Sequence, residues 1–555
     1  MTDSRTEASA EKPTPSRRST LVASGVMAAL FCISFDIARH NDLITGAVAP
    51  AQPLDLLVIP AILGVWCIAY RLIALIDRRF VRRGPRPLSV RAKVATCAAL
   101  LAVWGCYLVV FCPGFIYFDT MNSYWQFTGQ IAYSNYHPVL YTALVGLLAS
   151  LPYPQGLPWT FMFFWLGVLQ AVVLALIWTH CISWLAARGA PRWLIVFTFL
   201  FLLANPVVPL FVILLTSDAL FSGLVVLLIP IIYDLVHLPE RSVRLGDLMP
   251  FLAVSVGICF MRNNGIYVVL FTLFCLLFFF KRGRRAIVGA GVGVAVFWAF
   301  VLNVAYPAAG IAEVPFAEAV GIPLQQVGAT LADGDGRVTD EQLRFMSNIE
   351  TTDRLRHTWN PATADGIKYD LSFNDAYLNE HKVEFIKHWF AIGAENPKIY
   401  LKAYLMETQG WWDVGVYRWV RIGAGGWTWA PAYNVIDIDL LGDATGLPVR
   451  ATADAILSEE HLEWVPFANA AGNVWCVALA IVILLRGRRE QRPGALALAP
   501  LVGIWITLMI ASPIFCEFRY VFALCLSWPF LLFLPCHEPA SEALRLSDGG
   551  RAPEA

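Results

Sequence analysis

The sequence predicts an α-helical polytopic membrane protein with about 12 transmembrane helices and an extracytoplasmic, mainly α-helical soluble domain. Of the 555 residues, 58% are hydrophobic and 15% are charged, and the mean hydropathy is +0.60. Soluble domains are usually far less apolar than this. Apolar runs long enough to cross a bilayer recur along the chain, and more than half of the acidic residues gather in one polar stretch from 306 to 467. These observations favour a lipid-embedded helical core with one solvated domain.

The chain begins with the polar residues 1–19, which predict a disordered cytoplasmic tail. Residues 20–92 predict a transmembrane hairpin and a basic cytoplasmic loop, 93–305 a transmembrane core, 306–467 the extracytoplasmic domain, 468–536 the C-terminal transmembrane helices, and 537–555 a cytoplasmic tail. The predicted spans, each of about 20 residues, begin near Leu21, Leu54, Val94, Leu157, Trp193, Ala219, Leu248, Ile266, Ala286, Ala468, Gly494 and Tyr520.

Short basic loops set the predicted orientation. Arginine and lysine are concentrated in the loops 78–86, 281–285 and 486–492, and such loops face the cytoplasm. This rule places both termini in the cytoplasm and residues 306–467 outside the cytoplasmic membrane, provided that the apolar piece 139–151 does not cross. Pro138 and Pro152 bound that piece, so we expect an extended outer loop over 113–137 and a juxtamembrane helix over 138–151. Because the basic residues are distributed as topology signals, we expect no nucleic-acid partner.

With this orientation, the polar residues that are hardest to explain by packing all lie at the outer surface. They occupy four separate turns and comprise Asp119 and His137, then Asp218, then Arg262, Asn263 and Asn264, and last Glu517, Arg519 and Tyr520. Ionisable groups at the edge of the hydrocarbon are expensive unless they are paired or face a water-filled cavity. We therefore expect one shared site. The alternative is that each residue separately caps a span at the interface.

A carboxylate and arginines beside lipid suit chemistry on a lipid-linked phosphate. Arginine presents a planar fork to phosphate oxygens, so Arg262, Arg519 and Tyr520 are predicted to bind the phosphate of the donor. Asp119 is the predicted catalytic base, which would accept a proton from an acceptor hydroxyl late in the reaction. The predicted supporting residues are His137, Asp218, Asn263, Asn264 and Glu517. Asp119, His137, Asp218 and Glu517 could alternatively share a divalent cation, magnesium or manganese.

The polar stretch contains further candidates. Gln325 and Gln326 could bind sugar hydroxyls, and Trp411 and Trp412 could stack on sugar rings; a structural turn, membrane anchoring and ordinary core packing are the alternatives. Thr339 followed by Gln342 predicts a helix with a capping box.

Several short segments carry a resemblance to a known superfamily. They are Pro113-Gly114 with Asp119, residues 134–141, Ser217-Asp218, residues 262–265, 322–326 and 404–412, and Phe518-Arg519-Tyr520. The chain resembles the C-type membrane glycosyltransferases, which use polyprenyl-phosphate sugars, and within them a bacterial family of polytopic glycosyltransferase-like proteins. The resemblance implies an inverting transfer of a sugar from a polyprenyl-phosphate donor to a glycan, lipid or protein acceptor of the cell envelope, with Asp119 at the position of the superfamily's acidic residue.

Two other classes of function remain open. A transporter or flippase of a lipid-linked saccharide should carry polar residues or broken helices near the middle of the membrane. A non-catalytic envelope scaffold should scatter the outer polar residues instead of gathering them in one site.

Overall fold

A computed structural model describes residues 17–42, 47–48, 61–62, 64–66, 68, 86–238, 242–416, 435–465, 467–487 and 489–537. Most of both predicted tails, most of the second predicted span from Leu54 and the basic loop 78–86, except for Arg86, lie outside the described residues. The described chain is mostly helical. It contains two small sheets, each of two strands.

Five helical stretches in the described residues are long and apolar enough to cross a membrane. They are α3 (Val90–Val110), η1 with α6 (Trp159–Ala187), α9 (Ser217–Val236), α12 through α13 (Arg284–Ala308), and η9 with α25 (Arg492–Ile510). A sixth span results if the bent pair Phe518–Leu526 and Trp528–Cys536, which meet at 41°, is taken as one. The described chain is therefore a helical protein with several helices that could span a membrane.

The prediction of about twelve spans is corrected by this count. Each predicted apolar run within the described residues is helical, but several helices end early. The shorter apolar helices are Gly25–Ala38 within α1 (Arg17–His40), α7 (Arg192–Ala204), η3 with α10 (Leu245–Met261), α11 (Gly265–Phe279) and α24 (Ala470–Arg486). At about 1.5 Å per residue, 13–17 residues reach roughly 20–25 Å, which is less than the roughly 30 Å of a hydrocarbon core.

The predicted juxtamembrane helix over 138–151 corresponds to α5 (Val139–Ala149). The preceding segment differs from the expectation. Residues 113–137 are not extended throughout, because they contain the strand β3 (Phe115–Ile116) and the helix α4 (Phe118–Phe127). The ten residues of α4 mix aromatic and polar side chains without an apolar period, which is why the sequence pattern did not predict a helix there.

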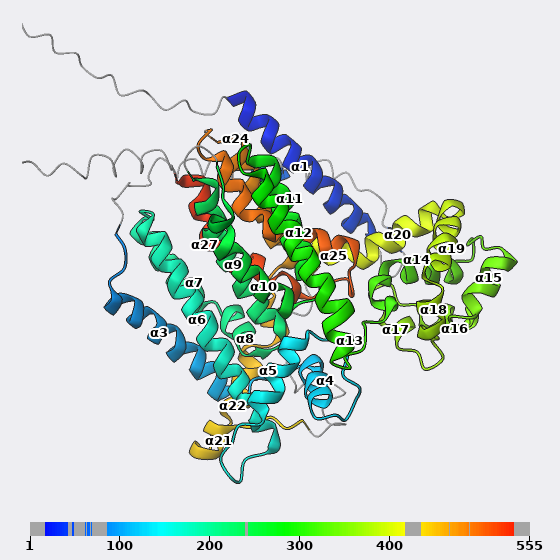
Figure 1. Ribbon diagram of the computed structural model, residues 1–555, viewed down its shortest axis with the longest axis horizontal. Coiled ribbons are helices and arrows are strands. Elements are labelled where there is room, and N and C mark those ends of the chain that lie inside the picture. Colours follow the sequence, from blue (N-terminus) through cyan, green and yellow to red (C-terminus); the bar gives the residue numbers. More distant parts are fainter. Residues whose placement is uncertain are drawn as a thin grey trace, which may run out of the picture.

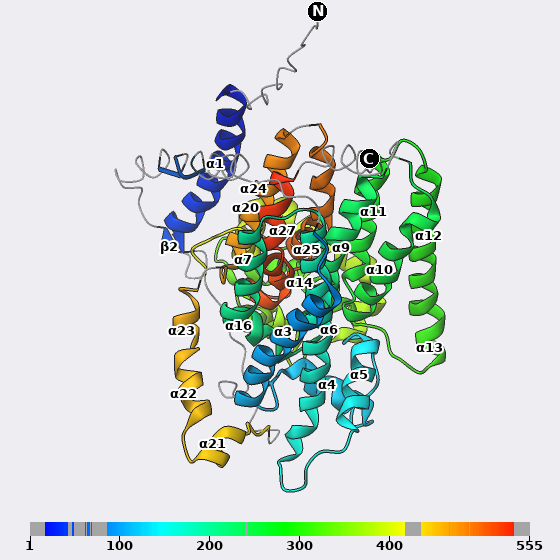
Figure 2. The same ribbon diagram turned by 90° about the vertical axis from the view of Figure 1, so that its left-hand side faces the viewer.

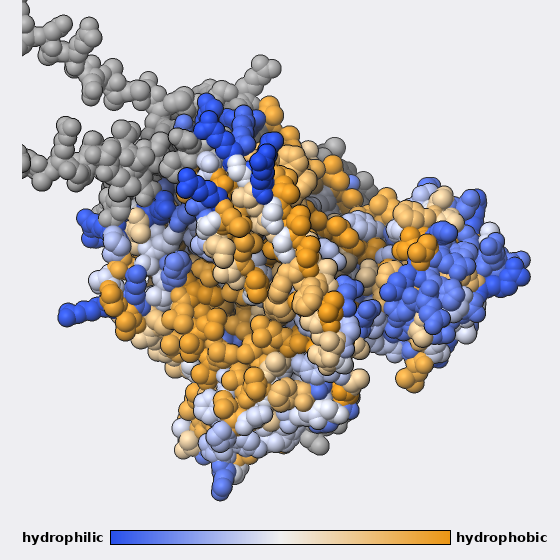
Figure 3. All heavy atoms as spheres, in the orientation of Figure 1, coloured by the Kyte–Doolittle hydropathy of each residue, from blue (hydrophilic) through white to orange (hydrophobic). Residues whose placement is uncertain are grey.

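The two ends of the helical bundle differ in charge. Arginines follow α6, lie within the α11–α12 connection and at the start of α12, and flank the α24–η9 connection. In Figure 2 these connections lie at the top, whereas α4, α5 and α21 (Leu440–Thr445) lie at the bottom. Figure 3 shows hydrophobic side chains gathered over the middle of the visible face, between the two polar ends. This distribution matches what a lipid-embedded bundle requires.

Residues 316–408 form a helical cluster with its own core beside the bundle (Figure 1). Its buried side chains include Leu324, Phe345, Leu378, Phe385 and Ile392. Its elements are η5 (Phe316–Ala319), α14 (Gly321–Ala332), α15 (Asp340–Ser347), α16 (Thr352–Thr358), α17 (Asp365–Lys368), α18 (Asp375–Glu380), α19 (Lys382–Glu395) and α20 (Pro397–Thr408). The predicted capping box of α15 is confirmed, since the Thr339 hydroxyl accepts from the Gln342 N–H and the Gln342 amide accepts from the Thr339 N–H.

The rest of the 306–467 segment does not join this cluster. Residues 435–465 carry α21, α22 (Val449–Ile456) and α23 (Glu459–Leu462) and run along the bundle near α3 (Figure 2). The Ile438 N–H donates to the Cys112 carbonyl at 3.0 Å, and the buried Arg450 guanidinium donates to the same carbonyl at 2.7 Å. Arg450 also pairs with Asp437 at 2.8 Å. The segment that we expected to be one domain is thus divided between two places.

Candidate functional site

The site begins with a short parallel pairing. β3 lies parallel to β4 (Leu214–Leu215), with Phe115 opposite Leu214, and each strand leads directly into a helix, α4 or α9. Asp119 follows Phe115 at the same interval as Asp218 follows Leu214, so the pairing brings both carboxylates to the same level. Each lies in the first turn of its helix, where the helix dipole favours negative charge.

The close approach of the two strands depends on Gly114. Its φ is +110°, and a Cβ at this position would lie 2.8 Å from the Ile213 carbonyl oxygen. The Phe115 N–H donates to that carbonyl at 3.0 Å, and the Thr120 hydroxyl donates to the Leu215 carbonyl. Only glycine fits this geometry without strain.

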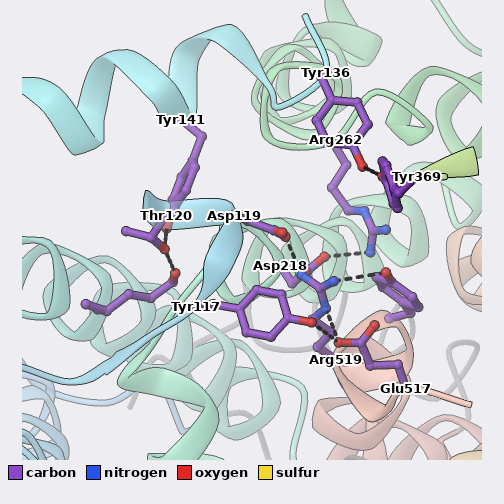
Figure 4. Close-up of polar contacts among 12 residues, drawn as sticks. Tyr117, Asp119, Thr120, Tyr136, Tyr141, Asp218, Arg262, Tyr369, Glu517 and Arg519 are labelled. Atoms are coloured by element: carbon purple, nitrogen blue, oxygen red, sulfur yellow. Dashed lines mark hydrogen bonds and ion pairs between the residues drawn. The ribbon is translucent and has the colours of Figure 1, made fainter. Parts of the chain in front are cut away.

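Arg519 joins three carboxylates from different parts of the chain (Figure 4). Its Nη1 lies 2.5 Å from Asp119 Oδ2 and 3.2 Å from Asp218 Oδ2. Its Nε donates to Glu517 Oε1 at 2.6 Å, and its Nη2 donates to the Tyr520 hydroxyl at 3.0 Å. Each nitrogen of the fork therefore holds a different partner, which a lysine ammonium could not reproduce.

Arg262 forms the second cationic position. It follows α10, and its Nη1 pairs with Asp218 Oδ1 at 2.6 Å. Its guanidinium lies 4.6 Å from the ring centroid of Tyr520 and 5.6 Å from that of Phe221, within cation–π distance. Asp218 thus bridges the two arginines, one through each carboxylate oxygen.

The members of this network differ in exposure. The side chain of Asp119 is 28% exposed and that of Arg262 is 17% exposed. The side chains of Arg519, Asp218 and Glu517 are exposed by only 7%, 5% and 3%. Asp119 and Arg262 are consequently the two charged groups that an incoming molecule meets first, and the other three support them from beneath.

Tyr117 also belongs to the network, and sequence reasoning missed it. The Tyr117 hydroxyl donates to Glu517 Oε1 at 3.0 Å, and the Arg519 guanidinium lies 4.3 Å from the Tyr117 ring centroid. Nearby, Tyr136 at the end of the outer loop shares a hydrogen bond with Tyr369 of the 316–408 cluster (Figure 4). Tyrosine beside an apolar run is common, so its residue type gave no indication of this role.

The charges set the protonation states around the site. Burial by itself would raise the pKa of Asp119, but Arg519, His137 and Arg262 outweigh it and hold that pKa below its usual value. Burial raises the pKa of Glu517 above its usual value, although Arg519 opposes the shift. Burial lowers the pKa of His137, against the opposing effect of Asp119. Asp119 is therefore ionised and His137 is neutral at pH 7.

The remaining predicted supporting residues surround the network. His137 is buried, and its Nε2 has no hydrogen-bond partner among the described residues. Asn263 Nδ2 donates to the Asn135 carbonyl at 2.7 Å and so ties the α10–α11 turn to the outer loop. Asn264 Nδ2 reaches the Thr507 hydroxyl at 3.4 Å on α25.

The carboxylates do not form a ligand set for a divalent cation in this arrangement. Within the described ranges, no three His, Cys, Asp or Glu side chains are placed to hold a metal ion. Asp119, Asp218 and Glu517 each direct an oxygen at Arg519 instead of at a common centre. Among the described residues, the three carboxylates therefore share the Arg519 guanidinium as their common partner.

The four predicted acceptor contacts are corrected, because all are interior. Trp411 and Gln325 are 0% and 1% exposed, and Gln326 and Trp412 are 7% and 9% exposed. Gln326 Nε2 donates to the Tyr400 carbonyl at 3.0 Å within the 316–408 cluster. Trp411 Nε1 donates to the Ser512 hydroxyl at 2.9 Å. Three further tryptophans of the same polar stretch, Trp419, Trp427 and Trp429, lie outside the described residues.

A surface depression of about 970 Å³ lies elsewhere, on α15, α18 and α19. Its lining mixes both signs of charge, with Glu341, Glu384, Lys382 and Lys387 among its residues. None of its lining residues belongs to the carboxylate–arginine network, so the two features are separate.

Comparison with known proteins gives one match. No curated protein and no solved structure matches the chain. Residues 122–546 match a family described as "Family of unknown function (DUF6020)". The match contains Asp218, Arg262, Glu517 and Arg519 and begins just after Asp119. Because it spans about three quarters of the sequence, the chain belongs to the DUF6020 family.

Proposed function

We propose that the protein is a membrane glycosyltransferase that moves a sugar from a polyprenyl-phosphate donor to an acceptor of the cell envelope. One observation carries the proposal: an ionised carboxylate and an arginine, Asp119 and Arg262, are the open members of an otherwise buried carboxylate–arginine network. Buried charges are costly to maintain without a purpose. A base and a phosphate-binding cation next to lipid are the two groups that such a transfer needs.

The geometry supports different roles for the two arginines, phosphate binding for Arg262 and positioning for Arg519. Arg519 already faces three carboxylates, so little of its charge is left for a ligand. Arg262 has one carboxylate partner and rests on the Tyr520 ring, and it is the more exposed of the two. We therefore assign the donor phosphate to Arg262, with Tyr520 beneath it, and give Arg519 the task of fixing Asp119 and Asp218.

The chemistry balances in a single displacement. The acceptor hydroxyl oxygen attacks the anomeric carbon, and the bond from that carbon to the phosphate oxygen breaks with inversion. Polyprenyl phosphate leaves with the bonding electrons beside Arg262, and Asp119 takes the hydroxyl proton. Because the pKa of Asp119 is held low, it is a weak base, and the proton moves late, after the bond to phosphate has largely broken.

A lipid donor also needs an apolar approach to the site. α5 packs against α4, which carries Asp119, and exposes Leu140 and Leu147 by 40% and 61%. Phe118 and Phe127 of α4 are 38% and 39% exposed. These side chains offer a surface for the isoprenoid chain beside the charged groups.

The position of the network favours an enzyme over a transporter. Asp218 lies at the start of α9, and Arg262 lies at the end of α10, so the charges are at one end of the bundle and not at its middle. The basic connections lie at the other end. Under the positive-inside rule, we place the site at the outer face of the cytoplasmic membrane and the termini in the cytoplasm.

The test uses the full chain in proteoliposomes with short-chain polyprenyl-phosphate monosaccharides and an envelope fraction as the acceptor source. Released polyprenyl phosphate is measured by mass spectrometry. We expect Asp119→Asn to lower the rate about 10²- to 10⁴-fold, the usual contribution of a general base. We expect Arg262→Gln to lower the transfer rate as well.

A control variant is Asp370→Asn, which removes a carboxylate paired with Arg354 at 2.8 Å in the 316–408 cluster. Full transfer by a folded Asp119→Asn protein would refute the mechanism.

A further inference from the structure

The segment that carries Arg519 is held by the 316–408 cluster and the turn that follows it. Residues 511–516, the 511–516 linker, connect the end of α25 at Ile510 to Glu517 and the short helix η10 (Phe518–Val521). Two parts of the chain form hydrogen bonds with this linker: residues 360–363 and η6 (Gln409–Trp411). Both parts lie far from Asp119 and Arg262 in the sequence and bind neither of them.

Most of these contacts are made by the backbone of the linker. The Gly410 N–H donates to the Phe515 carbonyl at 2.8 Å, and the Phe515 N–H donates to the Ala362 carbonyl at 2.8 Å. The Thr363 hydroxyl donates to the Pro513 carbonyl at 3.1 Å. Thr363 and Ile514 also form an isolated antiparallel bridge. The backbone of the linker therefore has partners on either side.

The Trp411 side chain contacts Ser512 within the linker and Tyr520 in η10, beyond the linker. Its Nε1 donates to the Ser512 hydroxyl at 2.9 Å, and the Ser512 hydroxyl donates to the Ile514 carbonyl at 2.8 Å. Its ring centroid lies 6.3 Å from that of Tyr520, the residue whose hydroxyl accepts from Arg519. Trp411 is fully buried, so this arrangement is rigidly packed.

The fit at Gly410 is close. A Cβ at this position would lie 2.3 Å from the Cβ of Cys516 and 2.5 Å from the Phe515 carbonyl oxygen. Any larger residue would push the linker away from η6. Cys516 directly precedes Glu517, which holds Arg519 Nε at 2.6 Å, so a displacement here moves the network.

We infer that Trp411 and Gly410 are positioning residues that fix the Glu517–Arg519 segment, so that η6 and residues 360–363 of the 316–408 cluster together hold the site in place. Trp411 was the residue that the sequence suggested as an acceptor contact, and its buried indole serves the site from behind instead. The expected effect on the transfer rate rests on the proposed glycosyl transfer. The expected effect on hydrogen exchange does not depend on it.

The experiment compares Trp411→Phe with Trp412→Phe in the full-length protein in detergent. The two neighbours are matched, since Trp412 is also buried but its Nε1 donates at 3.2 Å to Thr408 within its own helical segment. Hydrogen exchange is followed on peptides covering 511–521. We expect Trp411→Phe to raise exchange there about fivefold, the effect of one lost buried hydrogen bond. Trp412→Phe should leave these peptides unchanged, while both variants lower the melting temperature to a similar extent.

A pH profile separates positioning from general destabilisation. Arg519 helps to hold the pKa of Asp119 low. If Trp411→Phe loosens Arg519, the acidic limb of the transfer rate should move to higher pH, whereas Trp412→Phe should leave it in place. Equal exchange in the two variants would overturn the inference. If the wild-type protein transfers no sugar, the proposed function fails and the exchange measurement still decides the positioning role.

A second pair of variants tests the inference in case Trp411→Phe does not fold. Gly410→Ala should raise exchange over 511–521, and Gly334→Ala, where a Cβ meets nothing within 4 Å, is its control. Unchanged exchange in folded Gly410→Ala protein would also overturn the inference.

Discussion

At the scale of single residues, the charge balance of the network depends on Arg519. Three carboxylates converge on it, and Arg262 compensates one of them from the other side. Removing one partner of a buried ion pair leaves an uncompensated charge, which is more costly than the pair is favourable. The two arginines should therefore differ sharply when each is neutralised.

We expect Arg519→Gln to lower the free energy of unfolding by about 3–5 kcal/mol. Arg262→Gln should cost less, about 1–3 kcal/mol, because its side chain is partly exposed and has a single carboxylate partner. Thermal unfolding in detergent, followed by tryptophan fluorescence, measures both. Equal losses would contradict the assignment of Arg519 as the central group.

Glu407 offers a second residue-scale test. It is 0% exposed, and neither carboxyl oxygen has a well-directed hydrogen bond among the described residues, although Gln325 lies beside it. Burial raises the pKa of Glu407 well above the usual value of 4.5. Between pH 4.5 and this raised pKa, Glu407 is protonated in the folded protein and ionised in the unfolded chain. Stability should therefore fall as pH rises from about 4.5, by up to about 1.4 kcal/mol per pH unit for one proton.

Glu407→Gln should remove this dependence, because glutamine cannot ionise. We expect a higher melting temperature than wild type at pH 8 and a smaller difference at pH 5. The exposed Glu341→Gln is the control for the same chemical change and should alter neither value. A pH-independent effect at position 407 would argue against a protonated buried carboxyl.

The charged members of the site could be predicted from the sequence, whereas the contribution of Tyr117 could not. Asp119, Asp218, Arg262 and Arg519 stood out because ionised groups beside apolar runs are expensive. Tyr117 did not, since a tyrosine beside an apolar run is common. For Trp411 the sequence left sugar contact and core packing open, because residue type alone does not determine burial, and the buried indole agrees with core packing.

At the scale of elements, the positions of helices followed from hydropathy, while their lengths did not. Runs of apolar residues begin where α3, α9 and α11 begin, within a few residues. Where they end depends on local breaks, such as Asn205 after α7 and Ser527 between α26 (Phe522–Leu526) and α27 (Trp528–Phe533). Side-chain contacts with neighbouring helices fix such breaks, and hydropathy alone does not contain them.

The β3–β4 pairing gives the element-scale prediction. Gly114→Ala should destabilise the protein by about 2–4 kcal/mol, from a strained positive φ and a clash with the Ile213 carbonyl. Gly129→Ala is the control, because Gly129 also has a positive φ of +74° but a Cβ there meets nothing within 4 Å. Melting temperatures compare the two, and a cost at position 114 no larger than at 129 would show that the strands tolerate separation.

At the scale of the whole molecule, orientation is the property most open to direct measurement. The proposal places the 316–408 cluster outside the cell and the α24–η9 connection inside. Leu371→Cys, on a fully exposed side chain of the cluster, should react with a membrane-impermeant maleimide in intact cells. Arg489→Cys, in the exposed α24–η9 connection, should react only after permeabilisation, with modification assigned peptide by peptide. The reverse pattern would place the carboxylate–arginine network in the cytoplasm.

The separation of Asp119 and Arg519 by 400 residues also has a consequence for biosynthesis. Asp119 leaves the ribosome long before Arg519, whereas Asp218 has a nearer arginine partner in Arg262. Until Arg519 has been made, Asp119 must stay hydrated or pair with another cation. A chain that stops before Arg519 would contain most of the described helices but would lack the central cation of the network.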